Sequence, residues 1–303
     1  MNRAGTMRWV GVMLAGIALA TTAAPAAHAQ STGQLPNLPW PNLLPPAPGP
    51  ADVQPGPVPG CRKASLKCVD GVIRKLKARR DRLGCDHRAV FADTYMLLTK
   101  EMKRTIKRDP HFFSDNRWLI YEDVTFANFY FAIFKKGAPI PEAWQIAFDT
   151  AANGDQNAAQ DMLLGINAHV QRDMPYVLAS VGLRKPDGTS RKPDHDSPNQ
   201  VLQNAYETIV RDVERRYDPF IAISNSSATP LDDFGGLEMV KGWREGVWRN
   251  AERLLNAKSD ADRALVAQSI EQNAAAWARM IAATPGPPGY RQQRDTYCAG
   301  KNR

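Results

Sequence analysis

One segment of the sequence, residues 116–136, is apolar on almost every side of the helix that it would form. Its apolar side chains do not keep to a single face, as those of a surface helix do. They are Trp118, Leu119, Ile120, Val124, Phe126, Phe129, Phe131, Ile133 and Phe134. A helix without a polar face must be covered by other elements, so this segment predicts a central helix in a bundle.

The flanking sequence repeats its apolar residues at helical spacing and shows no β-hairpin signal. Helices are expected to begin near Val69, after Asp86, at Pro141, after Asp155, at the capping-box pattern Ser197–Gln200, around Trp243 and after Ser259. Residues 184–196 are predicted to be a polar loop, and residues 220–236 to be irregular. We therefore predict an all-α fold, a single bundle-like domain of seven or eight helices over residues 61–283.

The first 29 residues have the three parts of an export signal. Arg3 and Arg8 are the positive part, residues 9–20 are a short apolar run, and Ala27-His28-Ala29 is a cleavage site before Gln30. This is the one continuous apolar run, which excludes a polytopic membrane protein. We expect a signal peptide over residues 1–29 and a secreted, extracellular or cell-envelope-associated protein; the alternative is an uncleaved N-terminal anchor.

Residues 30–60 contain ten prolines and are expected to form a disordered, extended leader, not a helix or a central strand. The alternative for this stretch is that Trp40 and Leu43-Leu44 dock on a partner. A second breaker, residues 285–289, separates the helical body from a C-terminal tail over residues 284–303.

The chain has four cysteines, and an even number in an exported protein indicates two disulfides. A helix between Cys68 and Cys85 would hold these two residues too far apart to be joined. We favour Cys61–Cys68 together with Cys85–Cys298, which would staple the tail to the body. The pairing Cys61–Cys85 with Cys68–Cys298 stays open.

Positive charge is concentrated in one part of the chain. Residues 61–108 hold 15 basic and 5 acidic side chains, and the density peaks at Arg74, Lys75, Lys77, Arg79, Arg80 and Arg82. One interpretation is contact with an anionic cell-envelope or membrane surface. The other is the solvated outer face of an amphipathic helix. Nucleic acid is not expected as a partner, because no recognition motif accompanies the charge. The sequence does not indicate an oligomeric state.

The candidate chemistry lies in the helix expected after Asp155. His169 and Asp173 are four residues apart on its apolar stripe, so their side chains are expected to touch. Pro175 follows and is expected to break or kink the helix, opening a cavity there. The pair is a structural core pair, a metal-free acid–base pair, or two ligands of a divalent metal ion.

Asp123 lies in the central helix, where a carboxylate needs a partner. His169 is the partner that we expect, directly or through a metal held by His169, Asp173 and Asp123. Asn128 is expected to complete the polar cluster. His195 lies in the polar loop and is expected to be exposed to solvent. The sequence has none of the G-x-S-x-G, Gly-rich phosphate-loop or H-E-x-x-H motifs.

Three blocks of the sequence resemble an uncharacterised bacterial family, domain of unknown function 5995. They are residues 83–92, 123–132 and 165–175, and Trp248–Glu252 is a fourth similar block. The resemblance implies a helical fold and places Asp123, Asn128, His169 and Asp173 in the family's motif blocks. The family brings no established activity.

A looser similarity connects the His169–Asp173 spacing, closely followed by proline, to all-helical zinc-dependent phospholipases C and nucleases. The further histidine ligands of that class are missing after Pro175. We therefore expect either a hydrolase of lipid or phosphoester type, with or without a metal, or a non-catalytic protein attached to the envelope through its basic helix. Whether the protein is an enzyme is left open.

Overall fold

A computed structural model of the chain describes residues 38–44, 49, 58–221 and 230–301. In these ranges the regular elements are helices, apart from one isolated bridge between Arg184 and Ser190, so the predicted all-α class is confirmed. None of the helices in the described ranges is long and apolar enough to cross a membrane. The signal peptide expected at residues 1–29 and most of the proline-rich leader lie outside the described residues.

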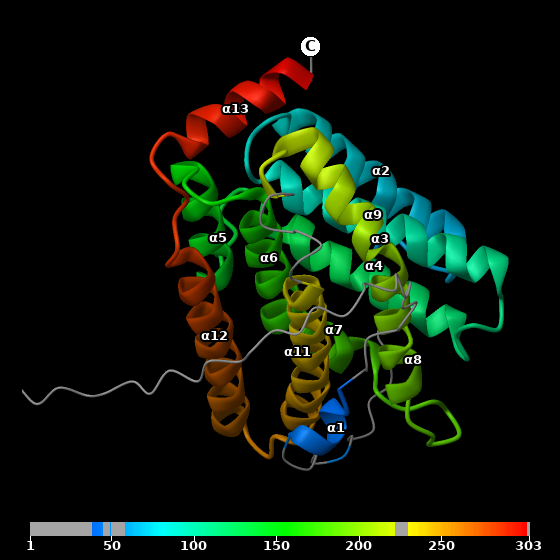
Figure 1. The fold of residues 1–303 in the computed structure, drawn as a ribbon. Coiled ribbons are helices and arrows are strands. Elements are labelled where there is room, and N and C mark those ends of the chain that lie inside the picture. Colours follow the sequence, from blue (N-terminus) through cyan, green and yellow to red (C-terminus); the bar gives the residue numbers. More distant parts are fainter. Residues whose placement is uncertain (1–37, 45–48, 50–57, 222–229, 302–303) are drawn as a thin grey trace, which may run out of the picture. The chain divides into compact units, whose positions relative to one another are not determined.

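The helices of the body pack on one another around several apolar clusters (Figure 1). In chain order they are α2 (Leu66–Leu83), α3 (Ala89–Arg108), α4 (Asn116–Ala132), α5 (Glu142–Asn153), α6 (Ala158–Asn167), the π-helical segment η1 (Ala168–Asp173), α7 (Met174–Val181), α8 (Lys192–Asp196), α9 (Pro198–Tyr217), α11 (Pro230–Asn256), α12 (Asp260–Ala282) and α13 (Tyr290–Lys301).

Helix α4 lies among other helices, as its all-round apolar sequence predicts. Asp115 caps its start, because the carboxylate accepts a hydrogen bond from the amide of Trp118 at 3.0 Å. The helix packs against α2, α7 and η1. The indole of Trp118 donates to the carbonyl of Gly182 at 2.9 Å, which ties α4 to the end of α7. The helix ends at Ala132 and not at Lys136.

The helix expected after Asp155 changes type along its length. Asn157 and Gln160 form a capping box at the start of α6. The chain then widens into η1, in which the amide of Met174 reaches back to the carbonyl of His169, and it narrows again into α7. Pro175 falls in the first turn of α7, where a missing N–H is tolerated. The predicted interruption by proline therefore takes the form of a π-helical turn just before it.

Two disulfides join the cysteine pairs that the sequence favoured. The Cα atoms of Cys61 and Cys68 are 5.5 Å apart, and those of Cys85 and Cys298 are 5.8 Å apart. The tail that Cys298 attaches is the helix α13, which lies beside α9 (Figure 1). A buried cation adds to the attachment, because the guanidinium of Arg294 donates to Asp161 at 2.6 Å.

Arg294 also contacts the buried side chain of His87, because its guanidinium lies 2.8 Å from Nδ1 of the imidazole. On the other side of the ring, Nε2 is 3.0 Å from the carboxylate of Asp295. His87 therefore belongs to the contact between the body and α13, in addition to its place at the start of α3.

Other local expectations need correction. The expected loop 184–196 contains the short helix α8, and residues 220–236 are helical from Pro230 onward. Ser197 does not form the predicted capping box, because its hydroxyl donates to the carbonyl of Pro193 at 2.7 Å and not to the start of α9.

The proline-rich leader includes one helical turn, α1 (Trp40–Leu43), so the expectation of no helix is wrong there. Pro41 is compatible with it, because proline is tolerated in a first helical turn. The indole of Trp40 donates to the carboxylate of Glu238 at 3.1 Å. A Cβ on Gly242 would lie 3.0 Å from the ring of Trp40, so a glycine in α11 makes room for the indole. Trp40 therefore docks on the chain's own helix.

Candidate functional site

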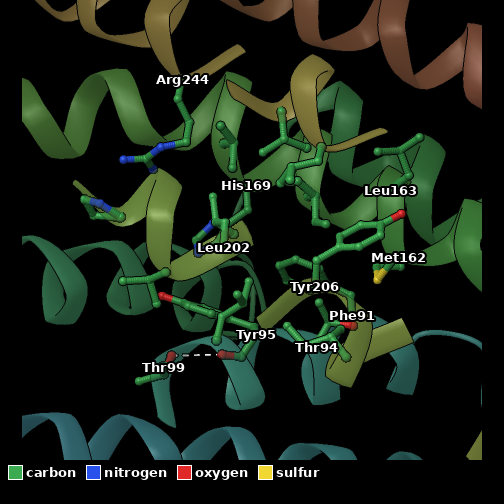
Figure 2. Close-up of a pocket in the computed structure, with 18 of the residues that line it drawn as sticks. Phe91, Thr94, Tyr95, Thr99, Met162, Leu163, His169, Leu202, Tyr206 and Arg244 are labelled. Atoms are coloured by element: carbon green, nitrogen blue, oxygen red, sulfur yellow. Dashed lines mark hydrogen bonds between the residues drawn. The ribbon is translucent and has the colours of Figure 1, made fainter. Parts of the chain in front are cut away.

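A cavity of about 370 Å³ lies between α3, α4, α6, η1, α9 and α11. That volume is within the usual range for small-molecule sites. Figure 2 shows side chains from several of these helices around it. Most of its wall is apolar, including Phe91, Met102, Leu119, Phe126, Leu163, Ile166, Val201, Leu202, Ile209 and Val240.

His169 reaches this cavity from η1, and Asp173 holds its ring. Nδ1 of His169 is 3.0 Å from Oδ2 of Asp173, and both side chains are almost fully buried. The same oxygen accepts a hydrogen bond from the indole of Trp144 at 2.9 Å, and the other carboxylate oxygen accepts from Arg172 at 3.0 Å. The predicted contact between His169 and Asp173 is confirmed. Because the carboxylate accepts from Nδ1–H, Nε2 carries the lone pair.

Aromatic rings surround the imidazole of His169. The ring of Phe126 stacks on it at 3.4 Å between centroids, and the Tyr95 ring lies edge-on at 4.9 Å. Burial lowers the pKa of His169, and the bond to Asp173 opposes this only in part. The imidazole is therefore neutral near pH 7, and its buried Nε2 has no hydrogen-bond partner among the described residues.

Among the described residues, four further polar groups in the wall lack hydrogen-bond partners in the same way: Thr94, Tyr95, Glu122 and Asp123. Oδ2 of Asp123 and the hydroxyl of Tyr95 are buried and make no hydrogen bond within the described part of the chain. Burial, and to a lesser extent the neighbouring carboxyl of Glu122, raises the pKa of Asp123 to about 8. Burial also raises the pKa of Tyr95 well above its usual value, with Asp123 the second cause. The two side chains are therefore close enough to interact electrostatically.

Glu122, adjacent to Asp123, faces a different neighbour. Its Oε1 lies 3.6 Å from Nδ1 of His195, whose Nε2 is 3.1 Å from the carbonyl of Arg244. A carbonyl only accepts, so Nε2 of His195 carries the proton and Nδ1 is bare. Burial raises the pKa of Glu122 to about 7, against the opposing charge of Arg244. A protonated Glu122 is thus suited to face His195.

His195 corrects the sequence-based expectation of a solvent-exposed residue. Its side chain is fully buried, packed near the ring of Trp248 and held between Glu122 and Arg244. Burial, followed by the charges of Arg244 and Lys192, lowers its pKa well below the usual value. Its neighbours in sequence are polar, but α8 turns the ring inward.

The structure does not bring all four predicted site residues together. His169 and Asp173 are bonded, and Asp123 lines the same cavity as His169, but no direct hydrogen bond joins Asp123 to His169 in the described part of the chain. Asn128 is not in the cluster, because its amide donates to the carbonyl of Pro59 at 2.9 Å. Spacing within one helix fixes a face, whereas a contact between helices depends on their relative rotation, which the sequence does not show.

The predicted metal set does not assemble either. Nδ1 of His169 is used by Asp173, and Asp123 does not join them. Among the residues that the structure describes, no group of three or more His, Cys, Asp or Glu side chains is placed to hold a metal ion.

Sequence reasoning missed several residues of the wall. Tyr95 and Glu122 were not predicted as site residues, yet both line the cavity. Thr94 and Arg244 also line the cavity, and Trp144 supports Asp173 from behind. The available signal was in α4, where two adjacent acids occur in an otherwise apolar helix.

The basic residues of α2 fall into two groups. Arg80 and Arg79 serve the fold, because Arg80 donates to the buried Asp93 at 3.1 Å and Arg79 lies 3.2 Å over the ring of Phe134. Arg74, Lys75, Lys77 and Arg82 are exposed, and Lys77 is paired with Asp81 at 2.5 Å. One face of α2 is therefore both basic and open to solvent.

Comparison with known proteins gives one match. The model of DUF5995, a family of unknown function, matches residues 69–284. No curated protein matches the sequence, and no solved structure matches the fold. The matched range includes every helix that lines the cavity.

Proposed function

The chain belongs to the DUF5995 family, and we propose from the cavity in its helical domain that it binds an amphiphilic small molecule. One observation carries the proposal. An apolar cavity of about 370 Å³ has in its wall five buried polar atoms without hydrogen-bond partners among the described residues: the hydroxyls of Thr94 and Tyr95, Oε1 of Glu122, Oδ2 of Asp123 and Nε2 of His169.

The energetics support an occupant. A buried polar group without a hydrogen bond costs about 1–3 kcal/mol. A ligand that places an apolar chain against the cavity wall and a polar head group against these atoms would remove much of that cost. Sites of this kind, mostly apolar with a few polar groups, are typical of small-molecule binding.

In this proposal His169 belongs to the binding wall, Asp173 holds its ring, and neither takes part in a reaction. Within the described residues no hydroxyl or thiol side chain is hydrogen-bonded to Nε2 of His169, so no side-chain nucleophile is paired with this base. The stacked ring of Phe126 covers one face of the imidazole. The hydrolase hypothesis needs a separate assay with an ester or phosphoester of similar chain length, because the probe and the alcohols used below have no hydrolysable bond.

The proposal includes an exported location. The signal-like residues 1–29 and the two disulfides support it, because disulfides persist in oxidising compartments.

The exposed cations of α2 support a second proposal, attachment to an anionic lipid membrane. We expect binding to vesicles that contain phosphatidylglycerol to weaken steeply with salt. Changing Arg74, Lys77 and Arg82 to alanine should reduce it, whereas changing the exposed Arg211, Arg253 and Lys258 to alanine should not. Equal retention on neutral and anionic vesicles would exclude this attachment.

The ligand-binding proposal is tested with a neutral fluorescent probe, N-phenylnaphthylamine, and a series of n-alkyl alcohols as competitors. The wild type should bind the probe, and longer alcohols should displace it at lower concentrations because they bury more methylene groups. Leu163→Trp fills the cavity and should abolish binding, whereas Leu265→Trp, on an exposed site of α12, should not. Absence of probe binding, or equal binding by both variants, would contradict the proposal.

A further inference from the structure

We infer that the head group which this cavity accepts is a protonated primary amine, bound by Asp123, Tyr95 and His169. The inference rests on the proposed function, because it specifies the ligand of the same cavity. The ligand class is an amphiphilic alkylamine, with its chain along the apolar wall.

The hydrogen-bond inventory of the wall favours a donor. Nε2 of His169 is an acceptor, since Nδ1–H is used by Asp173 at 3.0 Å. Oδ2 of Asp123 accepts when the carboxyl is ionised, and the oxygen of Tyr95 can accept as well. All three atoms are buried and without partners in the described part of the chain. An ammonium group offers three N–H donors and no acceptor, which matches this set.

The charges around Asp123 favour a cation. Burial, and after it the charge of the adjacent Glu122, raise the pKa of Asp123. Arg244 also lines the cavity, but its guanidinium donates to Asn199 at 2.8 Å and to the carbonyl of His195. Asp123 therefore holds a proton in the empty cavity near pH 7, and an ammonium group that binds beside it would favour the ionised carboxylate, with release of that proton.

The apolar surroundings suit the same head group. Phe91, Tyr95 and Phe126 line the cavity, and aromatic faces attract ammonium groups. A carboxylate head group would meet the opposite conditions, because it would lie against Asp123 and Glu122 with few free donors.

The test compares four ligands of one chain length by displacement of the neutral probe near pH 7. They are dodecylamine, dodecyltrimethylammonium, dodecanol and dodecanoate. Dodecylamine should bind at least about tenfold more tightly than dodecanol, which is the factor expected for one charge-assisted hydrogen bond. The trimethylammonium ligand should bind less tightly than the amine, because it has no N–H to donate.

Two variants locate the effect. Asp123→Asn should reduce the preference for amine over alcohol to about twofold or less, while Asp149→Asn, an exposed acid on α5, should keep the wild-type preference. Tyr95→Phe should weaken the binding of dodecylamine and so reduce the preference for amine over alcohol. These comparisons use the full-length chain, produced by export to an oxidising compartment so that both disulfides can form.

The outcomes separate this inference from the proposed function. If the alcohol binds as tightly as the amine, or if dodecanoate binds best, the amine inference is wrong and the binding function stands. If Asp123→Asn retains the amine preference, the assignment of the head group to Asp123 is wrong. If neither the probe nor any of the four ligands binds, both fail.

Discussion

Replacing Asp123 by asparagine should stabilise the protein, and the gain should grow with pH. Burial raises the pKa of Asp123 from 3.8 to about 8 in the folded chain. The folded state therefore keeps the proton over a pH range in which the unfolded state has lost it. Because the unfolded state binds fewer protons there, the wild type loses stability as the pH rises from about 4 to about 8 and then levels off. Asparagine does not titrate, so the variant lacks this loss.

The magnitude follows from the two pKa values. The difference between 3.8 and about 8, at about 1.36 kcal/mol for each pH unit, corresponds to on the order of 5 kcal/mol for an isolated group. Four titratable or charged groups face the same region: Glu122, Tyr95, His169 and Arg244. Burial raises the pKa of Glu122 to about 7, so this residue also lowers the free energy of unfolding as the pH rises. The Asp123 variant keeps that loss. We therefore expect a gain of about 2–5 kcal/mol above about pH 8 and less than about 1 kcal/mol near pH 4.

The measurement is urea unfolding of wild type, Asp123→Asn and Asp149→Asn over this pH range, without ligand. The exposed Asp149 is the control, and its variant should follow the wild type. The reasoning fails if the free energies of unfolding of wild type and Asp123→Asn run parallel with pH. It also fails if the Asp123 variant is the less stable protein at high pH, since that would reveal a partner for the ionised carboxylate.

Three further changes test the surrounding structure by urea unfolding. Trp144→Phe removes one donor from the buried Asp173 and should cost about 1–2 kcal/mol; no loss would mean that the indole bond is unimportant. Arg294→Met leaves buried carboxyls without their cation and should cost about 3–5 kcal/mol, so a loss under about 1 kcal/mol would contradict the buried ion pair. Gly165→Ala should cost about 1–3 kcal/mol and weaken probe binding, because its Cβ would lie 2.3 Å from Cγ of Phe91 in the cavity wall; unchanged binding would show that Phe91 can move without effect.

Much of the fold could be predicted because its signals are local. The all-round apolar sequence of α4 requires neighbours on every side, and the helical separation of Cys68 and Cys85 disfavours joining them. The contact between His169 and Asp173 needs only a spacing of four residues, and it survives the change to a π-helical turn. Each of these inferences depends on a single segment of chain.

The parts that failed depend on contacts between distant segments. The residues next to His195 in the sequence are charged residues and a proline, yet α8 buries its ring near that of Trp248 in α11. The amide of Asn128 donates to the carbonyl of Pro59, which belongs to the leader that was expected to be extended and disordered. The position of Asp123 relative to His169 is set by how α4 rotates against η1. No pattern within either segment fixes that rotation.

The two adjacent acids of α4 illustrate the limit most clearly. Neighbouring residues on a helix point about 100° apart, so Glu122 faces His195 while Asp123 lines the cavity without a described partner. The sequence shows two costly carboxyls but not what each of them faces. In the fold both line the cavity and each has an oxygen without a hydrogen bond among the described residues, but Glu122 has the imidazole of His195 at 3.6 Å. Asp123 is the one that we assign to a ligand. Its burial weakens the empty protein, and a ligand that pairs with it would add stability as its concentration exceeds the Kd. Folding and binding are then linked through Asp123, so the residue that is least favourable in the empty domain is the one that most specifies the occupant.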